Sequence, residues 1–199
     1  MPADRPFAES CVQNRDPILA VLAPRLRPYR DLLEIGSGTG QHAVYFAPQL
    51  PWLRWQTSDR VENHAGIRAW LASAEGGDIV APLALNVLTD AWPQGPYDAV
   101  FSANTAHIMP PPAVEAMFRG VGRLLAGGGR FFLYGPFSQK GRHTAQSNVD
   151  FDAHLRQRDP AMGVRDVSWL RELADSAGMQ LDEDIAMPAD NKTLVWLKE

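Results

Sequence analysis

Apolar runs and amphipathic stretches alternate along the chain from about residue 17 to its end. Short apolar runs bounded by polar residues and glycines predict buried strands, whereas apolar residues spaced three or four apart predict helices. Strands and helices that alternate in this way are typical of a mostly parallel sheet with helices wound about it. The pattern therefore predicts an α/β fold.

The predicted strands cover 32–35, 54–57, 79–87, 97–103, 130–134, 180–187 and 193–197, and the predicted helices cover 17–26, 42–50, 63–75, 113–125 and 168–177. Asp16 is a candidate N-cap of the first helix, with Pro17 in its first turn. Because Pro82 cannot donate to a ladder, we expect its strand to lie at a sheet edge or to begin after the proline. Gly127 to Gly129 should end the helix before them. The polar link 189–191 predicts an antiparallel hairpin of the last two strands.

Residues 135–166 form a polar insert in which this periodicity fails. A long aperiodic segment inside a compact domain is usually functional or disordered. We expect the insert and an N-terminal arm, residues 1–16, to cover a substrate. The whole chain, residues 1–199, suits a single domain of ordinary size.

The net charge and the cysteine content limit the kinds of partner and the compartment that we expect for this protein. The net charge is −4, so the molecule as a whole should be repelled by nucleic acid. Lys140, Arg142 and His143 could bind an anion locally or belong to a solvated loop. Cys11 is the single cysteine, so no internal disulfide forms, and no run approaches the roughly 20 apolar residues that span a bilayer. We expect a soluble, cytoplasmic protein without nucleic-acid or membrane partners.

A glycine loop follows the first predicted strand in the segment LLEIGSGTGQHA, residues 32–43. Gly36, Gly38 and Gly40 occupy every second position, where the absence of side chains lets the backbone bend sharply and a ligand approach. The helix behind them offers free N–H groups at its start. In a doubly wound sheet, ligands bind outside the carboxyl ends of the strands, so this loop is a candidate ligand site; the alternative is an ordinary tight turn.

Two ligand classes use such a loop, dinucleotides and S-adenosylmethionine (SAM). The dinucleotide fingerprint G-x-G-x-x-G requires a glycine where this chain has Gln41. Glu34 precedes the first glycine by two residues; its carboxylate would repel a pyrophosphate and attract the ammonium and sulfonium groups of SAM. The loop therefore favours SAM.

Polar residues also end the next two strands. Asp59 could accept both hydroxyls of a ribose, and Asn86 could offer its amide to an adenine edge, with Val87 and Leu88 against the ring. Each has a structural alternative. Asp59 could cap the helix that begins near Asn63, and Asn86 could merely end a strand.

Together, Glu34-x-Gly36-x-Gly38-x-Gly40, Asp59, Asn86 and the strand that ends before Asn104 resemble the successive motifs of the class I SAM-dependent methyltransferases. The resemblance implies a Rossmann-like, doubly wound, seven-stranded sheet of order 3-2-1-4-5-7-6 with the seventh strand antiparallel. It also implies SAM as cofactor and S-adenosylhomocysteine (SAH) as product. The cofactor-binding residues that it implies are Asn14, Glu34, Gly36, Ser37, Gly38, Gly40, His42, Asp59, Asn86, Val87 and Asn104.

Further segments resemble a small, uncharacterised methyltransferase-like family: Asn14, 17–19, 134–137, 147–148, 151–152, 158–160 and 163–166. The N-terminal arm departs from that family, because Ser10 and Cys11 follow Glu9 where Glu, Arg and Asn are expected in close succession.

Methyl transfer is an in-line displacement, so an enzyme mainly aligns the two reactants and excludes water. Asn104 and His107 follow the fourth strand and are the candidate catalytic residues. His107 could take a proton from the nucleophile or be merely structural. Within the insert, three further polar residues could line the acceptor pocket or make turns and caps: Asn148, Asp150 and Asp152.

We expect no metal, because the fourth strand ends in Asn104 where a Mg²⁺-dependent enzyme would need an acid. The sequence therefore predicts a SAM-dependent methyltransferase that acts on a small molecule. One alternative is a SAM-binding module without catalysis. Another is a nucleotide-dependent oxidoreductase, which Gln41 and Glu34 disfavour.

Overall fold

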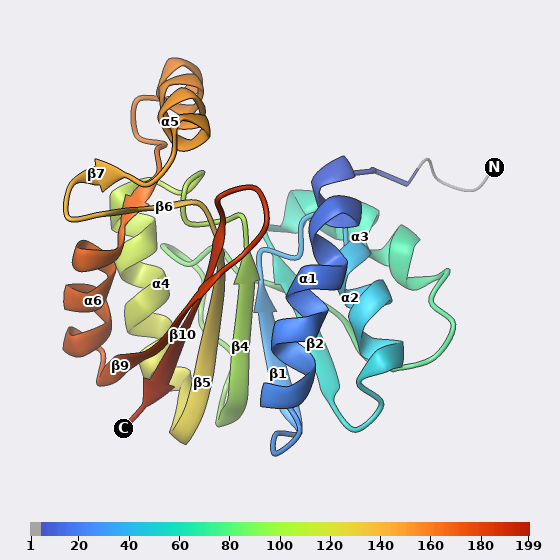
Figure 1. The fold of residues 1–199 in the computed structure, drawn as a ribbon. Helices are drawn as coiled ribbons and strands as arrows, with labels where there is room; N and C mark the ends of the chain where they lie inside the picture. The colour runs from blue at the N-terminus through green and yellow to red at the C-terminus, as the bar shows by residue number, and fades with distance from the viewer. Residues whose placement is uncertain (1–4) are drawn as a thin grey trace.

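A seven-stranded sheet runs through the middle of the computed structural model, which describes residues 5–199 (Figure 1). Its strands are β1 (Asp31–Ile35), β2 (Arg54–Asp59), β3 (Asp78–Ala84), β4 (Tyr97–Ala103), β5 (Leu125–Gly135), β9 (Met179–Ala186) and β10 (Lys192–Lys198). Residues 1–4 of the expected N-terminal arm lie outside the described residues.

The strand order is β3-β2-β1-β4-β5-β10-β9. β1 to β5 pair in parallel, whereas β10 is antiparallel to both of its neighbours. This confirms the predicted fold class, strand order and antiparallel seventh strand. β3, which contains Pro82, lies at an edge as predicted.

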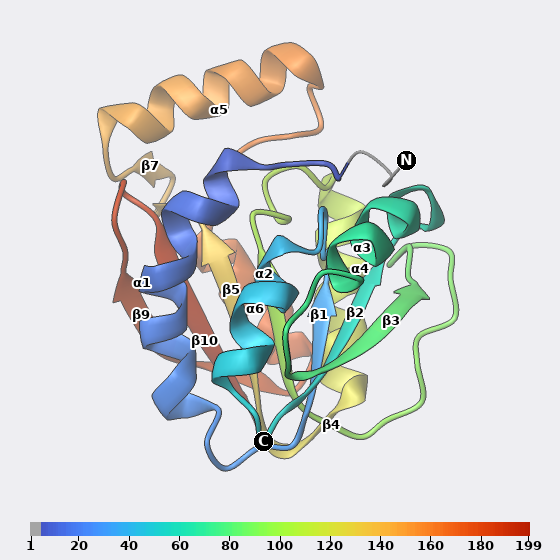
Figure 2. The ribbon, with the colours of Figure 1, turned by 90° about the vertical axis from the view of Figure 1, so that its right-hand side faces the viewer.

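Helices cover both faces of the sheet. The α-helices of the described residues are α1 (Glu9–Arg25), α2 (Gln41–Phe46), α3 (His64–Leu71), α4 (Pro111–Leu124), α5 (Gln146–Arg158) and α6 (Val167–Ser176), and all but α5 lie against a face of the sheet (Figures 1 and 2). Figure 2 shows α1, α2 and α3 on one face and α4 and α6 on the other. Because successive strand residues point to opposite faces, Leu32 joins the core beneath α1 and α2 while Leu33 joins the core beneath α4.

α1 begins at Glu9, eight residues before the predicted start. Pro17 lies inside this helix, and the Asp16 carboxylate accepts a hydrogen bond from the Tyr45 hydroxyl instead of capping a helix start. The extra turns dock on the glycine loop and α2, because the Ala8 N–H donates to Oε1 of Gln41 over 2.7 Å. Tertiary contacts therefore extend α1 beyond what its own periodicity predicts.

Other helix and strand ends also differ from the predictions. The helix predicted over 63–75 is a 3₁₀ turn, Val61–Asn63, followed by α3. The helix predicted over 42–50 is α2 followed by a 3₁₀ turn, Ala47–Gln49. β3 ends at Ala84, three residues before the predicted end. Each of these differences lies at a terminus, where local pattern is least decisive.

The glycines 127–129 do not end a helix directly, because β5 already begins at Leu125. Tyr97 pairs with Leu125 and Ala99 pairs with Arg130, so residues 126–129 bulge from the ladder. Glycine tolerates such a bulge because it has no side chain to accommodate.

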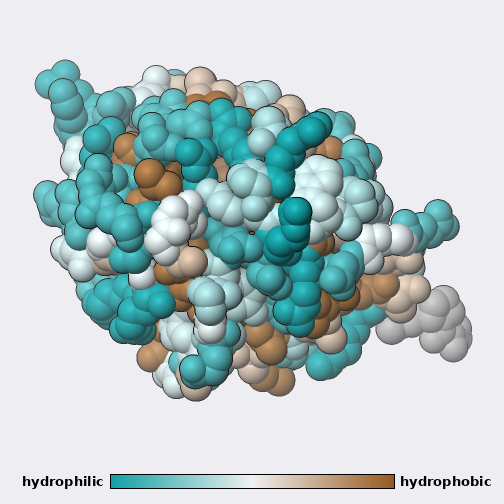
Figure 3. All heavy atoms as spheres, turned by 90° about the horizontal axis from the view of Figure 1, so that it is seen from below, coloured by the Kyte–Doolittle hydropathy of each residue, from teal (hydrophilic) through white to brown (hydrophobic). Residues whose placement is uncertain are grey.

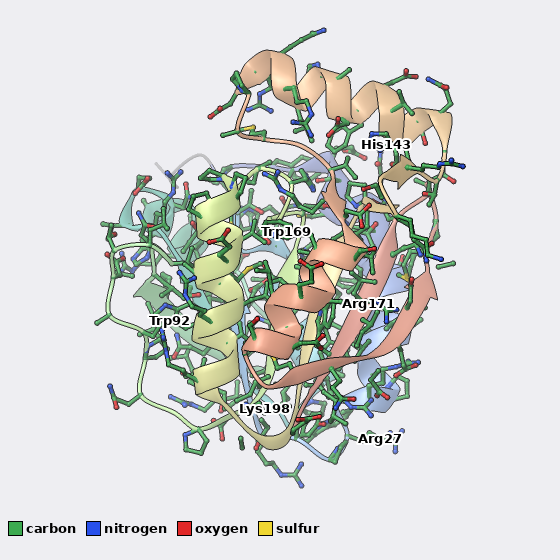
Figure 4. The ribbon with its side chains drawn as sticks, turned by 90° about the vertical axis from the view of Figure 1, so that its left-hand side faces the viewer. Arg27, Trp92, His143, Trp169, Arg171 and Lys198 are labelled. Atoms are coloured by element: carbon green, nitrogen blue, oxygen red, sulfur yellow. The ribbon has the colours of Figure 1, made fainter. Side chains whose placement is uncertain are left out.

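The insert has regular structure, which the sequence did not predict. β6 (Phe137–Gln139), β7 (Arg142–His143) and β8 (Arg165–Asp166) form a second small sheet of order β7-β6-β8. α5 lies above the carboxyl ends of the central strands (Figures 1 and 2), and His143 lies beneath it (Figure 4). Among the α5 residues only Asn148 and Leu155 are buried, so this helix has no apolar stripe to detect in the sequence.

The end of the chain consists of α6, β9 and β10. Asp166 caps α6, because its carboxylate accepts a 2.8 Å hydrogen bond from the Ser168 N–H. β9 and β10 form the expected antiparallel hairpin. These elements place α5, the glycine loop and the segments after β2, β3 and β4 around one edge of the sheet.

Candidate functional site

The three loop glycines all have left-handed backbone conformations, with φ of +71° at Gly36, +58° at Gly38 and +91° at Gly40. Such angles disfavour residues with a Cβ. A Cβ at Gly36 would also lie 2.6 Å from Cγ2 of Thr105, whereas one at Gly38 would meet open space. The loop is thus held tightly against the segment after β4 and leaves its middle glycine accessible.

Glu34 is buried directly behind this loop. Its Oε2 accepts hydrogen bonds from Oγ of Ser37 (2.8 Å) and Nε1 of Trp55 (3.0 Å). Burial, and to a smaller extent the charge of nearby Asp59, raise the pKa of Glu34 to about 7. Trp55 cannot be predicted as a partner from the sequence, because only the parallel register of β1 and β2 brings it close to Glu34.

Asp59 links the end of β2 to the glycine loop. Its Oδ2 accepts a 2.7 Å hydrogen bond from the Gly38 N–H, and its Oδ1 accepts from the Arg60 N–H (2.7 Å) and from Nδ2 of Asn63 (2.8 Å). α3 begins without any side-chain cap, so Asp59 does not serve as the helix cap that was its structural alternative.

Two carboxylates therefore flank the loop, and neither has a cationic partner within residues 5–199. Glu34 bonds only to neutral donors, and Asp59 accepts from backbone and amide groups. The guanidinium of Arg60 turns instead to Glu62, 3.2 Å away. The loop thus lies between two acidic groups without a cationic counterpart, and the local field is negative wherever these groups are ionised.

Asn14 and His42 bond to each other. Nε2 of His42 lies 2.8 Å from Oδ1 of Asn14, and the His42 ring stacks on Phe46 with centroids 5.2 Å apart. Burial lowers the pKa of His42 to about 4. Both side chains therefore join α1 to α2 beside the glycine loop.

Asn86 begins a turn after β3. Its Oδ1 accepts from the Leu88 N–H (3.1 Å), and its own N–H donates to Oδ2 of Asp90 (2.7 Å). Within residues 5–199 its side-chain Nδ2 makes no hydrogen bond to protein and remains a free donor. Val87 is buried in the core, whereas Leu88 is 51% exposed. Leu88, rather than Val87, therefore has an apolar side chain that a ligand can contact.

Asn104 and His107 converge on the end of β5. A Cβ at Gly135 would lie 3.6 Å from Nδ1 of His107 and 4.0 Å from Oδ1 of Asn104. Asn104 has a left-handed backbone (φ +59°), a conformation that in a residue other than glycine is concentrated at functional sites. The two predicted catalytic side chains thus lie together at the carboxyl edge of the sheet.

His107 is buried against the insert. Its ring packs edge-on to Phe151 of α5, with centroids 5.2 Å apart. Burial, and secondarily the charge of Arg165, lower the pKa of His107 to about 4. Its imidazole is therefore neutral at pH 7.

The polar residues of α5 mainly fasten the helix. Nδ2 of Asn148 donates to the Asp190 carbonyl over 3.0 Å. Oδ1 of Asp152 accepts from the Val164 N–H over 2.7 Å, and Asp150 accepts from Gln146 of the first turn over 2.9 Å. These contacts correspond to the structural alternative that the sequence left open.

Arg165 lies in one of the segments that resemble the small methyltransferase-like family, and its side chain holds the loop that carries His107. Its buried guanidinium donates to the carbonyls of Ala106 (3.0 Å), Ala161 (2.7 Å) and Met109. The His107 carbonyl in turn accepts from the Gly163 N–H over 2.9 Å. Such a role cannot be predicted from the sequence, because the three acceptors are backbone groups.

Among residues 5–199, no three His, Cys, Asp or Glu side chains are grouped as metal ligands. In the same part of the chain, no helix combines the length and apolar character needed to cross a membrane. Cys11 is a free thiol near Thr39 and Glu34, and burial raises its pKa to about 11.

A family model described as "Protein of unknown function (DUF938)" matches residues 5–198, almost the whole chain. The chain belongs to the DUF938 family. This assignment agrees with the narrower of the two resemblances in the sequence.

Solved structures place this DUF938 chain in a wider fold group. An O-methyltransferase family protein from Burkholderia thailandensis is 17% identical with a TM-score of 0.82, covering 96% of this chain and 58% of that one. Human N-acetylserotonin methyltransferase in complex with SAM is 16% identical with a TM-score of 0.79, covering 96% of this chain and 53% of that one. PigF with SAH is 18% identical with a TM-score of 0.78, covering 96% of this chain and 64% of that one. The DUF938 chain thus has a class I SAM methyltransferase-like fold and spans between 53% and 64% of these longer chains.

Proposed function

We propose that this protein is a SAM-dependent methyltransferase that acts on a small molecule. The observation that carries the proposal is the glycine loop flanked by Glu34 and Asp59, two carboxylates with no cationic partner among the described residues. A ligand with an ammonium and a sulfonium would relieve that negative field, whereas a pyrophosphate would add to it.

Other residues of the site fit the same ligand. Gly38 leaves open space in the loop, and Oδ2 of Asp59, which accepts a single hydrogen bond, keeps a lone pair for a ribose hydroxyl, whereas Oδ1 already accepts two. The free Nδ2 of Asn86 can donate to an adenine nitrogen. Val61 and Leu88 follow β2 and β3 and are 66% and 51% exposed, so they offer apolar contact to a base.

Gln41 argues against a dinucleotide. It stands where the fingerprint requires its last glycine, and its buried side chain accepts from the Ala8 N–H and from Oγ1 of Thr39 (2.9 Å). The bound SAM and SAH of the human enzyme and PigF support the same choice by fold analogy.

When bound, SAM supplies a methyl group whose bond to the positively charged sulfur breaks as its bond to the acceptor forms, leaving the electron pair on sulfur. The protein's residues then have three tasks. Glu34 and Asp59 hold the cofactor's charge and ribose, and α5 covers the edge of the sheet and keeps water out. His107, neutral at pH 7, takes the proton that a hydroxyl acceptor loses, while Asn104 orients the acceptor beside it.

Calorimetric titration with SAM, SAH and NAD⁺ tests the binding half of the proposal. We expect heat with SAM and SAH but not with NAD⁺, and at least tenfold weaker binding by Asp59→Asn. Asp98→Asn is the matched control, because the Asp98 carboxylate also accepts two backbone N–H bonds, from Arg30 (2.8 Å) and Asp31 (3.0 Å), but at the opposite edge of the sheet. Absence of binding to SAM and SAH, or unchanged affinity in Asp59→Asn, would refute the proposal.

Transfer of a labelled methyl group from SAM into a fractionated metabolite extract tests catalysis. We expect a labelled small molecule with the wild-type protein, much less with His107→Ala or Asp59→Ala, and no effect of a metal chelator. Tight SAM binding without transfer to any fraction would instead identify a SAM-binding module.

A further inference from the structure

Exposed apolar side chains are concentrated at the carboxyl edge of the sheet. The large apolar residues that remain exposed within residues 5–199 are Phe7, Val61, Leu88, Ile108, Val149 and Phe151. Each belongs to the N-terminal segment, to a segment that follows β2, β3 or β4, or to α5. Figure 3 shows the opposite edge, where hydrophilic side chains predominate. The apolar surface therefore gathers around the proposed site.

Two of these residues adjoin His107. Ile108 is the next residue in the chain and is 45% exposed, and Phe151 packs on the His107 ring while 36% of it remains exposed. Ile108 and Phe151 thus both border His107, one through the chain and one through the ring contact, and we call their exposed parts the Phe151–Ile108 surface.

Two charged side chains next to this surface, Arg165 and Asp152, are already engaged in hydrogen bonds. The Arg165 guanidinium donates to three backbone carbonyls. The Asp152 carboxylate accepts from the Val164 N–H (2.7 Å) and from Nε of Arg156 (2.8 Å), and it lies 3.7 Å from Nε2 of His143. A charged ligand group would have to displace these contacts, whereas an uncharged ring would leave them intact.

The same contacts make this surface preorganised. Arg165 joins the loop of His107 to the segment of Ala161, and Asp152 joins that segment to α5. Asn148 and Ser147 fasten the start of α5 to Asp190, over 3.0 and 2.7 Å. The two sides of the surface therefore keep one relative position, as selective binding of a rigid ligand requires.

We infer that the methyl acceptor is an uncharged aromatic hydroxy compound whose ring lies on the Phe151–Ile108 surface with its hydroxyl toward His107. This inference rests on the proposed function for the role of the hydroxyl, but the binding that it describes can be measured without methyl transfer.

The test uses 2-naphthol and 2-naphthoate, which share a ring system and differ in charge, titrated by ligand-observed NMR into the full chain in the presence of SAH. We expect 2-naphthol to bind at least tenfold more tightly than 2-naphthoate. Phe151→Ser and Ile108→Ser should each weaken 2-naphthol binding at least tenfold.

Val149→Ser is the matched control. Val149 is an apolar residue of α5 with similar exposure, 40% against 36%, and two positions along a helix place it roughly 200° around the axis from Phe151. We expect its affinity for 2-naphthol to stay within twofold of wild type, and circular dichroism should show all three variants folded.

Equal affinity for 2-naphthoate, or equal weakening by Val149→Ser and Phe151→Ser, would overturn the inference. So would SAH binding with no 2-naphthol binding. If 2-naphthol binds as expected but SAH does not, the proposed function fails and the apolar site stands.

Discussion

The indole of Trp55 in β2 donates a 3.0 Å hydrogen bond to the carboxyl group of Glu34 in β1, inside the protein and behind the glycine loop. The ionisation of Glu34 therefore affects both the stability of the fold and the charge of the site. Burial raises the pKa of Glu34 from 4.5 to about 7, so above that pH the ionised carboxylate is an isolated negative charge next to the loop that costs stability. A cationic ligand would compensate for it.

Glu34→Gln should stabilise the protein without ligand at pH 8. The folded state holds a proton on Glu34 up to about pH 7, whereas the unfolded chain releases it near 4.5, so the free energy of unfolding falls as pH rises through this window. The variant keeps an oxygen for Trp55 and Ser37 and should recover up to about 3 kcal/mol at pH 8. Urea unfolding at pH 4.5 and 8 measures this, and SAM affinity should fall.

Glu183→Gln is the control for that measurement. Arg25 bonds to Glu183 and lowers its pKa, so its charge stabilises the fold above its ordinary pKa and that contribution is lost as pH falls. This variant should be less stable than wild type at pH 8. If Glu34→Gln also proved less stable than wild type at pH 8, our account of Glu34 would be contradicted.

The two buried histidines should make the protein sensitive to acid. His42 and His107 have pKa values near 4, below their ordinary 6.5, so between these values the unfolded chain binds protons that the native state does not. Stability should therefore fall as pH decreases from 6.5 to 4, by at most about 3 kcal/mol for each histidine.

Urea unfolding between pH 6.5 and 4 measures this loss of stability. The measurement is best made in the Glu34→Gln variant, because protonation of Glu34 raises the stability of the wild-type protein over the same pH range. His42→Gln keeps a donor for Asn14 and should flatten the slope. A slope that His42→Gln leaves unchanged would show that His42 is protonated in the native state.

Alanine in place of Gly36 should destabilise the fold more than alanine in place of Gly38. Both positions have positive φ, but only at Gly36 would the new Cβ lie 2.6 Å from Thr105. We expect losses of about 3 kcal/mol for Gly36→Ala and about 1 kcal/mol for Gly38→Ala. Thermal unfolding measures the difference, and equal losses would contradict the packing of Gly36 on Thr105.

Arg165→Met should loosen the segment that carries His107. It leaves three carbonyls, those of Ala106, Met109 and Ala161, without a donor, at a cost of about 2 kcal/mol or more. Amide exchange should accelerate in 104–110, and the pKa of His107, measured by NMR, should rise because a positive neighbour is lost. Arg165→Lys should restore part of the pKa difference but not the three hydrogen bonds.

Much of the architecture follows from pattern and composition. Apolar runs predicted every strand of the central sheet, and an edge position for β3 was one of the two outcomes that Pro82 indicated, because a proline cannot donate to a second neighbour. The pattern missed α5, whose docking depends on single contacts such as Asn148 to Asp190 rather than on a stripe. The pattern also predicted too late a start for α1, because the first turns of this helix are held by contacts to Gln41, which lies in another element.

By itself the sequence determined the α/β winding, the glycine loop and the placing of Glu34, Asp59, Asn104 and His107 at strand ends, since these depend on residues close together in the chain. Only the tertiary structure decided that Glu34 bonds to Trp55, that Arg165 holds the segment of His107 and that Phe151 lies on its ring. The physical reason is that burial, protonation and hydrogen-bond partners depend on which distant residues pack together. The periodicity of residues along the chain does not determine this long-range packing.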